Sequence, residues 1–455
     1  MDIHEKLNLL GQAARFDDCV SPPSSLSSPS SLSSCSSPGN FGLFAAPESL
    51  CPAGHDMFPY VSHVQTPKGE RVPVLKVLQT SACQNNCYYC AFRAGRDLRR
   101  GTFSPDELAR AFDLMQRSGV VRGIFLSSGV IGTNRSMDEM LATVELIRGR
   151  YDFRGYVHLK LLPGAETAHI VRAIELADRV SVNLEAPTPE ALAALAPQKQ
   201  MAQLVGPLQA AAAVGAGFSA SPAGLPLNNS SGYPARLPSD NGKPAPTWAR
   251  LPSDNGKPAP TWARSPSNYD RPAPTVGHAR LGMSTQFVVG PAGESDRELL
   301  DRAQMLYREV RLARAYYSAF SPIRDTPLES APPTDPRREF RLYQADWLLR
   351  YYGFAAEEIP FQADGNLPEN LDPKAAWAQA HPERFPLEVN AAPLPELLRV
   401  PGIGPTSARA IVAARRQGRL RELGDLRKLG ARADRAAPFV LLGGRRPPYQ
   451  PPLPL

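Results

Sequence analysis

Apolar and amphipathic segments alternate regularly along the middle of the chain. Short apolar runs, rich in β-branched and aromatic residues and typical of buried strands, occur at 72–80, 123–128, 156–162, 179–186, 284–290 and 314–320. Segments with helical spacing of apolar residues lie between them, at 104–118, 136–150, 166–177, 188–200 and 295–310. One helix between successive strands predicts a parallel sheet with helices outside it. Six such units predict an α/β fold, a partial (β/α)6 TIM-like barrel that is short of the usual eight units.

The regular pattern stops at 206–280, inside the predicted barrel. This stretch is rich in Ala, Gly, Pro and Ser, and Ala235–Trp248 is repeated letter for letter by Ala249–Trp262. The repeated unit has no apolar periodicity, so its copies have no hydrophobic stripe on which to stack. The pattern predicts a disordered loop between the fourth and fifth strands. A Pro-rich docking segment that uses Trp248 and Trp262 is the alternative.

The flanking segments complete the predicted domain plan. A long helical pattern over 336–354 closes the barrel, and a Ser/Pro-rich low-complexity run lies in the N-terminal extension. The predicted units are the N-terminal extension (1–60), the barrel (61–358, interrupted at 206–280), a connector (359–387), a small all-α domain (388–446) and a Pro-rich tail (447–455).

Composition and charge narrow the class of protein. The 455 residues are 42% apolar, enough for a sizeable core, but no apolar run is long enough for a membrane span or a secretory signal. Six cysteines are too few for a disulfide scaffold and indicate a reducing cytoplasm, with Cys19, Cys35 and Cys51 as free thiols. Twelve basic and only four acidic residues lie between 391 and 446. This segregated charge predicts a polyanionic partner, with a solvated helical surface as the alternative.

The other three cysteines form a C-x-x-x-C-x-x-C cluster directly after the first strand of the series, at Cys83, Cys87 and Cys90. Three thiolates on one tight loop can hold three irons of a [4Fe–4S] cluster and leave the fourth iron open to another ligand. A zinc site is the alternative, but zinc takes four ligands and no second cysteine pair follows. His158 or Cys51 would have to complete it.

This motif, with the aromatic Tyr89 just before its third cysteine, resembles that of the radical S-adenosylmethionine (SAM) superfamily. The resemblance implies a [4Fe–4S] cluster that binds SAM and cleaves it reductively to a 5′-deoxyadenosyl radical. It also implies that Ser127, Ser128 and Gly129 stand where the superfamily has a Gly-Gly-Glu-like motif for the methionyl amine. This sequence lacks the glutamate, so hydroxyls or backbone carbonyls would accept that bond.

Further cofactor contacts follow from the same resemblance. On the fourth strand of the series, alternation places three polar side chains on one face, which resembles the ribose-contacting strand: Ser181, Asn183 and Glu185. On the fifth strand, Val288 and Gly290 resemble the adenine-supporting motif, with Gln286 in place of its first glycine. Each of these side chains is alternatively a polar group satisfied inside the barrel. Lys160, in register with His158, suits substrate acid–base chemistry or a buried ion pair.

The basic segment contains a strong match to a helix-hairpin-helix motif around Gly402-Ile403-Gly404. The glycines suit a tight turn, and Pro405 suits the first turn of the next helix. Successive amides of this turn are expected to bind a phosphate, with Ile403 as the apolar plug. The expected neighbouring phosphate contacts are Arg399, Arg409, Arg415 and Arg416. A weaker second hairpin lies at 423–430. The pair predicts sequence-independent binding to a nucleic-acid backbone, with protein contact as the alternative.

Together, the two modules resemble the DNA-modification or repair subfamily of radical SAM proteins that is linked to a uracil-DNA-glycosylase-like partner. The resemblance covers 72–205 and 281–446, with stretches such as QFVVGPAGESDRELL at 286–300. It implies a radical enzyme acting on nucleic acid, with duplex DNA as the expected substrate and a flavodoxin or ferredoxin as electron donor. The alternatives are modification of tRNA or rRNA, and a non-catalytic DNA-binding protein with a structural cluster.

Overall fold

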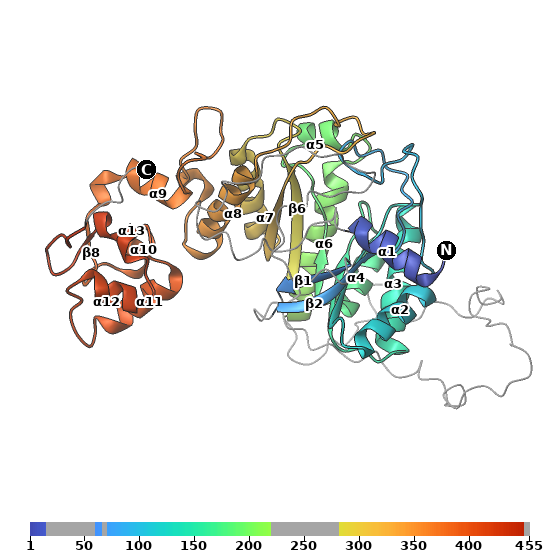
Figure 1. Cartoon of the computed structure of the whole chain (residues 1–455), viewed down its shortest axis with the longest axis horizontal. Helices are drawn as coiled ribbons and strands as arrows, with labels where there is room; N and C mark the ends of the chain where they lie inside the picture. Colours follow the sequence, from blue (N-terminus) through green and yellow to red (C-terminus); the bar gives the residue numbers. More distant parts are fainter. Residues whose placement is uncertain (15–59, 66–70, 220–281, 450–455) are drawn as a thin grey trace, which may run out of the picture.

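A single twisted sheet of seven strands forms the centre of the larger domain (Figure 1). The computed structural model describes residues 1–14, 60–65, 71–219 and 282–449. The strands are β1 (Val61–Gln65), β2 (Arg71–Leu78), β3 (Gly123–Ser127), β4 (Tyr156–Lys160), β5 (Arg179–Ser181), β6 (Gly282–Val289) and β7 (Arg314–Ala319). They lie in chain order across the sheet; β2 to β7 are parallel, and β1 pairs antiparallel with β2 at the edge. The predicted partial barrel is therefore confirmed, with one additional strand.

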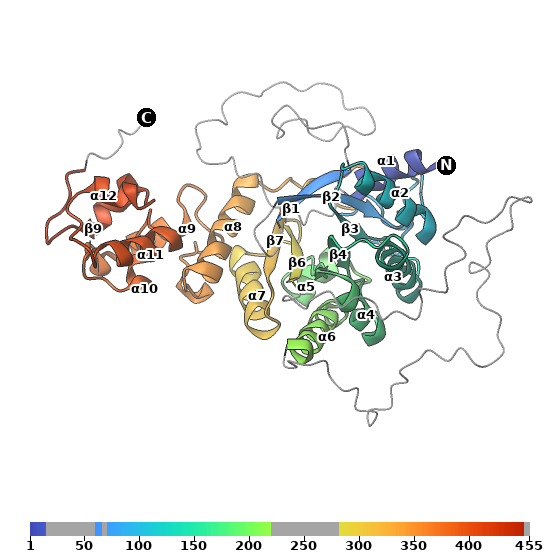
Figure 2. The same cartoon turned by 90° about the horizontal axis from the view of Figure 1, so that it is seen from below.

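The helices of this domain connect or flank the strands, and most of those that connect parallel strands cover one face of the sheet (Figure 2). They are α1 (Ile3–Ala13), α2 (Pro105–Arg117), α3 (Thr133–Gly149), α4 (Thr167–Leu176), α5 (Pro189–Leu195), α6 (Met201–Ser219), α7 (Asp296–Glu309) and α8 (Pro336–Tyr351). Local sequence explains where several begin. At α2, the Ser104 hydroxyl accepts from the Glu107 amide while the Glu107 carboxylate accepts from the Ser104 amide, as the Ser-Pro-Asp-Glu sequence predicts.

The two faces of the sheet carry different side chains. Alternate residues such as Leu75 and Val77 face the helices and belong to the main hydrophobic core. On the other face, Val74, Phe125, Tyr156 and Tyr316 form a smaller apolar cluster. The parallel strands all end at one edge, so the loops that follow β2, β3, β4 and β6 gather there. That edge carries the predicted cysteine motif.

The C-terminal domain lies beside α8, at the end of the molecule opposite to the N-terminal helix (Figures 1 and 2). Its elements, with the connector, are η7 (Ala356–Glu358), α9 (Pro373–Ala380), η8 (Pro382–Arg384), β8 (Leu387–Glu388), α10 (Leu394–Leu397), α11 (Pro405–Ala414), α12 (Leu423–Lys428), α13 (Ala433–Ala436), η9 (Ala437–Phe439) and β9 (Val440–Leu441). It has its own core, which includes Ile403, Ile411 and Leu426. It is helical apart from β8 and β9, a parallel pair of two-residue strands.

A stacked cation joins the C-terminal domain to the barrel domain. The Arg399 guanidinium lies 3.8 Å from the centroid of the Phe354 ring and 5.0 Å from that of Trp377. It also forms a 3.0 Å ion pair with Glu358. Two further contacts cross the same boundary: the buried Lys374 ammonium donates to the Ile403 carbonyl at 2.6 Å, and Arg435 pairs with Asp372.

The structure differs from the sequence-based expectation in two places. Helix α6 continues to Ser219, past residue 206 where the insertion was expected to begin, and includes Pro207. Strand β5 ends at Ser181, although the apolar pattern predicted a strand to 186. The repeated segment itself, the Ser/Pro-rich run, Cys19, Cys35, Cys51, Trp248 and Trp262 lie outside the described residues.

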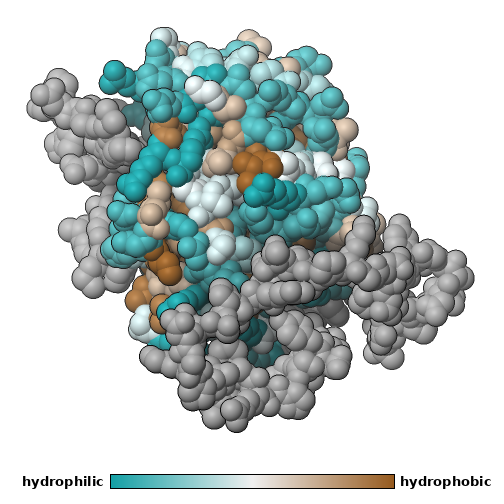
Figure 3. Space-filling model, turned by 90° about the vertical axis from the view of Figure 1, so that its right-hand side faces the viewer, coloured by the Kyte–Doolittle hydropathy of each residue, from teal (hydrophilic) through white to brown (hydrophobic). Residues whose placement is uncertain are grey.

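The surface of the barrel domain is mainly polar where Figure 3 shows it. On that face hydrophilic side chains predominate, and the hydrophobic patches are small and separate (Figure 3). Within the described part of the chain, none of the helices combines the length and apolar character needed to cross a bilayer.

Candidate functional site

The three clustered cysteines lie on an irregular loop that follows β2 at the C-terminal edge of the parallel sheet. Cys87 is buried, and Cys83 and Cys90 are partly buried. Backbone amides approach two of the sulfurs: Val130 N donates to Cys83 Sγ at 3.5 Å, and Phe92 N to Cys90 Sγ at 3.4 Å. Such N–H···S bonds are used by proteins to orient and tune sulfur ligands.

Arg100 holds this cysteine loop (residues 81–100) in shape. Its guanidinium donates to four backbone carbonyls, those of Ser81, Phe92, Arg93 and Arg96. A planar group with five donors in a fixed fork suits this role because it satisfies several carbonyls of an irregular segment at once. The sequence analysis did not identify Arg100, since nothing local marks it.

Gly129 brings the loop after β3 into close contact with the cysteine loop. Its amide donates to the Thr80 carbonyl at 2.7 Å, and the Gln84 amide donates to the Val130 carbonyl at 2.7 Å. A Cβ at position 129 would overlap the backbone carbonyl of Ala82. Glycine is therefore required here because two backbone segments approach closely. This requirement is independent of any cofactor contact that Ser127 and Ser128 make.

We expect Gly129→Ala to displace the cysteine loop and to impair iron binding, because a backbone carbonyl cannot rotate away as a side chain can. Overpacking of this kind costs about 1–3 kcal/mol. Iron content after anaerobic reconstitution, together with the melting temperature, measures both effects. Gly149→Ala is the matched control, because a Cβ there meets no atom within 4 Å. Equal iron content in the two variants would contradict the role given to Gly129.

A buried ion pair lies next to the cysteines. Lys199 Nζ is 2.9 Å from Glu185 Oε1, and both side chains are almost fully buried. Burial alone would lower the pKa of Lys199, but the charges of Cys87 and Glu185 overcome burial and raise it. Burial and the Glu185 carboxylate raise the pKa of Tyr89 well above its ordinary value. The glutamate predicted to contact a ribose thus has a lysine partner that the sequence analysis did not identify.

The donor set fits an iron–sulfur cluster. Three thiols share one loop, two of them already accept amide hydrogen bonds, and a buried lysine places positive charge beside the position where thiolates would form. Burial raises the pKa of Cys90 to about 12, so the free thiol is protonated and binding iron must release its proton. Among the described residues no three cysteine, histidine or acidic side chains are gathered tightly enough to hold a metal ion. This finding concerns a single ion; in a [4Fe–4S] cluster each thiolate binds a different iron, so the thiols need not converge on one point.

The predicted ribose-contacting residues alternate with residues of the main hydrophobic core, because Val180, Val182 and Leu184 belong to that core and Ser181, Asn183 and Glu185 do not. Ser181 is the last residue of β5, and its hydroxyl lies 2.9 Å from Nε2 of His158. The Asn183 amide donates to Gln286 on β6 at 3.2 Å. Glu185 lies beyond the strand with a φ of 65°, a left-handed conformation, and forms an isolated parallel bridge with Phe287 of β6. All three side chains are buried near the C-terminal edge, but each has a different partner.

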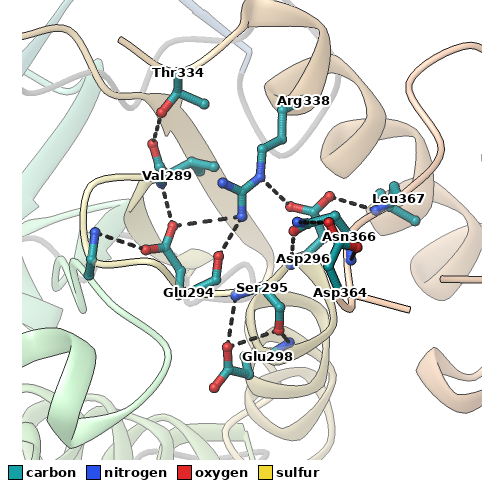
Figure 4. Close-up of polar contacts among 12 residues, drawn as sticks. Val289, Glu294, Ser295, Asp296, Glu298, Thr334, Arg338, Asp364, Asn366 and Leu367 are labelled. Carbon is teal, nitrogen blue, oxygen red and sulfur yellow. Dashed lines mark hydrogen bonds and ion pairs between the residues drawn. The ribbon is translucent and has the colours of Figure 1, made fainter. Parts of the chain in front are cut away.

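The turn after β6 is fixed by a network around Glu294 (Figure 4). The Glu294 carboxylate accepts from the amides of Gly290 and Ala292, and Arg338 donates to the Glu294 carbonyl and to Asp296. Gly290 has a φ of 107°, and a Cβ there would overlap the Thr334 hydroxyl. Val288 is buried, and its amide donates to the Glu185 carbonyl at 2.8 Å. The predicted adenine-supporting segment is thus a rigid turn beside Glu185.

His158 and Lys160 lie on β4, as predicted, with different surroundings. The His158 ring stacks on Phe125 at 4.2 Å between centroids and contacts Ser181, so the structure gives it partners other than the cysteines. This does not favour His158 as the fourth ligand of a zinc site. Burial raises the pKa of the Cys87 thiol. The positive charge of Lys160 opposes this effect in part.

The hairpin of the C-terminal domain presents fewer free amides than expected. The Ile403 amide donates to the Val400 carbonyl at 3.1 Å, and the Gly404 amide to the Ser407 hydroxyl at 2.8 Å. Neither is therefore available to a phosphate in this conformation. The amides of Thr406 and Ser407, in the first turn of α11, donate to none of the described residues.

The four arginines expected to contact phosphates divide into two classes. Arg399 is stacked in the domain boundary, and Arg415 donates to the carbonyls of Val389 and Ala392, so both have structural partners. Arg409 and Arg416 are exposed on or just after α11, where they can contact a polyanion. Arg409 also donates to the Pro405 carbonyl at 3.0 Å.

We expect Gly402→Ala to destabilise the C-terminal domain by about 2 kcal/mol or more. Gly402 has a φ of 86°, which costs a side-chained residue about 1–2 kcal/mol, and its Cβ would lie 2.5 Å from the Arg432 carbonyl oxygen. Gly404 is the control, because its φ is −98° and a Cβ there meets Tyr352 Oη only at 3.4 Å. Chemical unfolding curves of both alanine variants measure the difference. Equal stability would show that the turn tolerates a side chain at 402.

Two family models match this chain. Residues 77–226 match the radical SAM superfamily, and residues 386–433 match the helix-hairpin-helix motif. The chain therefore carries a radical SAM domain followed by a helix-hairpin-helix motif. Members of the radical SAM superfamily use a [4Fe–4S] cluster and SAM. No curated protein matches the sequence.

Three solved structures that match this chain all have TM-scores below 0.5. The [FeFe]-hydrogenase maturase HydG from Carboxydothermus hydrogenoformans is 12% identical, with a TM-score of 0.38. The match covers 60% of this chain and 50% of the maturase. Another structure of the maturase HydG is 11% identical with a TM-score of 0.39, and 60% of this chain covers 48% of it. Methylornithine synthase (PylB) is 11% identical with a TM-score of 0.37, and 71% of this chain covers 66% of it. The chain thus spans about half to two thirds of the length of these proteins.

Proposed function

We propose that this chain, which joins a radical SAM domain to a helix-hairpin-helix domain, is a radical SAM enzyme that modifies or repairs nucleic acid, with DNA as its substrate. When bound, the cluster and SAM supply a 5′-deoxyadenosyl radical that abstracts hydrogen from unactivated positions. Cys83, Cys87 and Cys90 are the residues that would hold the cluster. The contacts of Arg399, Lys374 and Arg435 across the domain boundary carry the proposal, because they fix the basic domain against the radical domain.

The chain's own residues shape the cofactor site in three ways. Arg100 and Gly129 hold the cysteine loop against the loop after β3. Lys199 supplies a buried positive charge beside the thiols, which favours their deprotonated, metal-binding form. The Glu294 turn closes the site near β6. Within this proposal, Ser127, Ser128, Gly129, Ser181, Asn183, Glu185, Val288, Gly290 and Tyr89 surround SAM.

The partners and location belong to the same proposal. A flavodoxin or ferredoxin would supply the electron, and a uracil-DNA-glycosylase-like protein would act with the enzyme on DNA. The cysteine usage supports a location in the reducing cytoplasm, where free thiols and a cluster persist. On the C-terminal domain, the exposed Arg409 and Arg416 support contact with a nucleic-acid backbone.

The test is reductive cleavage of SAM by anaerobically reconstituted full-length protein. With dithionite as reductant we expect 5′-deoxyadenosine, measured by mass spectrometry, and an altered nucleoside in digests of DNA incubated with the enzyme. An altered nucleoside in tRNA or rRNA, but not in DNA, would favour the alternative substrate. Iron-loaded protein that binds DNA without producing 5′-deoxyadenosine would instead support the non-catalytic alternative.

A further inference from the structure

A groove of about 600 Å³ lies between α8 and the hairpin of the C-terminal domain. One wall is aromatic and comes from α8, with Phe340, Tyr343 and Trp347. The other wall is the hairpin itself, from Gly402 to Ser407, together with Arg432. The hairpin therefore faces the barrel domain across this groove, whose volume of about 600 Å³ is that of a small-ligand site and not of a duplex.

Trp347 is an unusual surface residue in this groove. Its side chain is 50% exposed, although tryptophan is usually highly buried. Tyr351 lies one turn further along α8, with its ring centroid 4.8 Å from that of Trp347, and the Arg350 guanidinium lies 5.8 Å from the Trp347 ring. The indole therefore packs against two side chains of its own helix while it also lines the groove. A fixed, half-exposed aromatic ring is a surface on which an unpaired base can stack.

The charge lining the groove is positive. The Arg432 side chain is exposed and has no ion pair or hydrogen bond with any described residue. Lys374 also lines the groove and its side-chain nitrogen donates to the Ile403 carbonyl, but burial lowers its pKa to about 7, so it carries only part of a positive charge at neutral pH and Arg432 is the main charge here. Among the described residues that line the groove, Asp372 is the one acidic side chain, and it is paired with Arg435. Positive charge beside an aromatic ring is the combination that binds single-stranded nucleic acid.

We propose that this groove binds an unpaired nucleic-acid strand, with a base stacked on Trp347 and the adjoining phosphate bound by Arg432. The inference rests on the proposed function and adds to it: the strand is presented to the enzyme single-stranded or locally melted. Chemistry on a base requires that the base leave the helical stack, and an aromatic platform beside the hairpin offsets part of that cost. The exposed arginines Arg409 and Arg416 remain available to flanking phosphates.

The experiment compares a short oligothymidylate with a blunt duplex, using the full-length protein at low salt. We expect the single strand to bind more tightly and to quench tryptophan fluorescence. Trp347→Ala should weaken single-strand binding about tenfold and leave duplex binding unchanged, because loss of one stacked base has an effect of this size. Trp347→Phe keeps an aromatic face and should retain most of the affinity while abolishing most of the quenching.

A matched pair of variants tests the contribution of positive charge to binding. Arg432→Gln should weaken single-strand binding and lower its salt dependence by about one unit of slope. Arg427→Gln removes the same charge from the same domain, but Arg427 is paired with Asp434 and does not line the groove. It should leave single-strand binding within about twofold of the parent protein, since exposed pairs contribute little.

The outcomes separate this inference from the proposed function. If Trp347→Ala and Arg432→Gln bind the single strand as well as the parent protein, the groove is not the binding site. If duplex binds and the single strand does not, the groove inference is overturned while the proposed function stands. If neither nucleic acid binds, both are overturned. A ribonucleotide strand of matching sequence, tested in parallel, shows whether the groove distinguishes RNA from DNA.

Discussion

Anaerobic reconstitution should load iron into the parent protein and should fail in Cys83→Ala, Cys87→Ala and Cys90→Ala alike. Each variant removes one of three thiols on the cysteine loop, and a cluster bound through three protein ligands does not survive with two. Iron and sulfide content, together with the broad visible absorbance of an iron–sulfur cluster, measure the loss. We expect less than about a tenth of the parent iron content, because each ligand is needed to anchor one iron.

The chain supplies its own controls for this experiment. Cys19, Cys35 and Cys51 lie outside the motif, so alanine at any of them should leave the iron content unchanged. Retention of the cluster in one of the three motif variants would contradict the ligand assignment. Stoichiometric zinc without iron–sulfur absorbance in the parent protein would favour the zinc alternative instead.

Lys199→Met should lower the free energy of unfolding by about 3–5 kcal/mol, because it leaves the Glu185 carboxylate buried without a counter-charge. Both side chains are almost fully removed from water, so solvent screens this pair little. The double variant Glu185→Leu with Lys199→Met removes both charges and should recover most of the loss. Chemical unfolding of the metal-free protein measures the parent and both variants.

A second readout distinguishes a role beside the cluster from a purely structural one. The ammonium of Lys199 acts on Cys87, so the double variant should regain stability without regaining the parent's ability to retain iron against a chelator. If the double variant retains iron as well as the parent protein, Lys199 serves only to neutralise Glu185. If Lys199→Met is as stable as the parent, the pair contributes nothing to folding.

The fold and the cysteine motif could be predicted from the sequence because their signals are local. The capping box at Ser104 and Glu107 depends on residues three positions apart, and the cysteine spacing is contained within eight. Strand β1 was missed because Val61–Gln65 is short and lies at the edge of the sheet. Strand β5 ends at Ser181 and not at 186, and the left-handed φ at Glu185 departs from strand geometry.

Contacts between distant residues could not be predicted in the same way. Lys199 and Arg100 look like ordinary surface residues until the fold brings them to Glu185 and to the carbonyls of the cysteine loop. The arginine excess correctly marked a basic domain, but a count of charges does not show which of them already have partners. Arg399 and Arg415 are engaged within the protein, whereas Arg432, which sequence analysis did not single out, has none among the described residues.

The stacking of Arg399 on Phe354, beside Trp377, has a consequence for how the protein melts. A guanidinium that contributes to both sides of a boundary couples their unfolding, because opening either side exposes the same rings and breaks the same ion pair with Glu358. We therefore expect the sequence modules on the two sides of 358–388 to unfold as one cooperative unit. A calorimetric scan should show one transition, and Arg399→Ala should divide it into two.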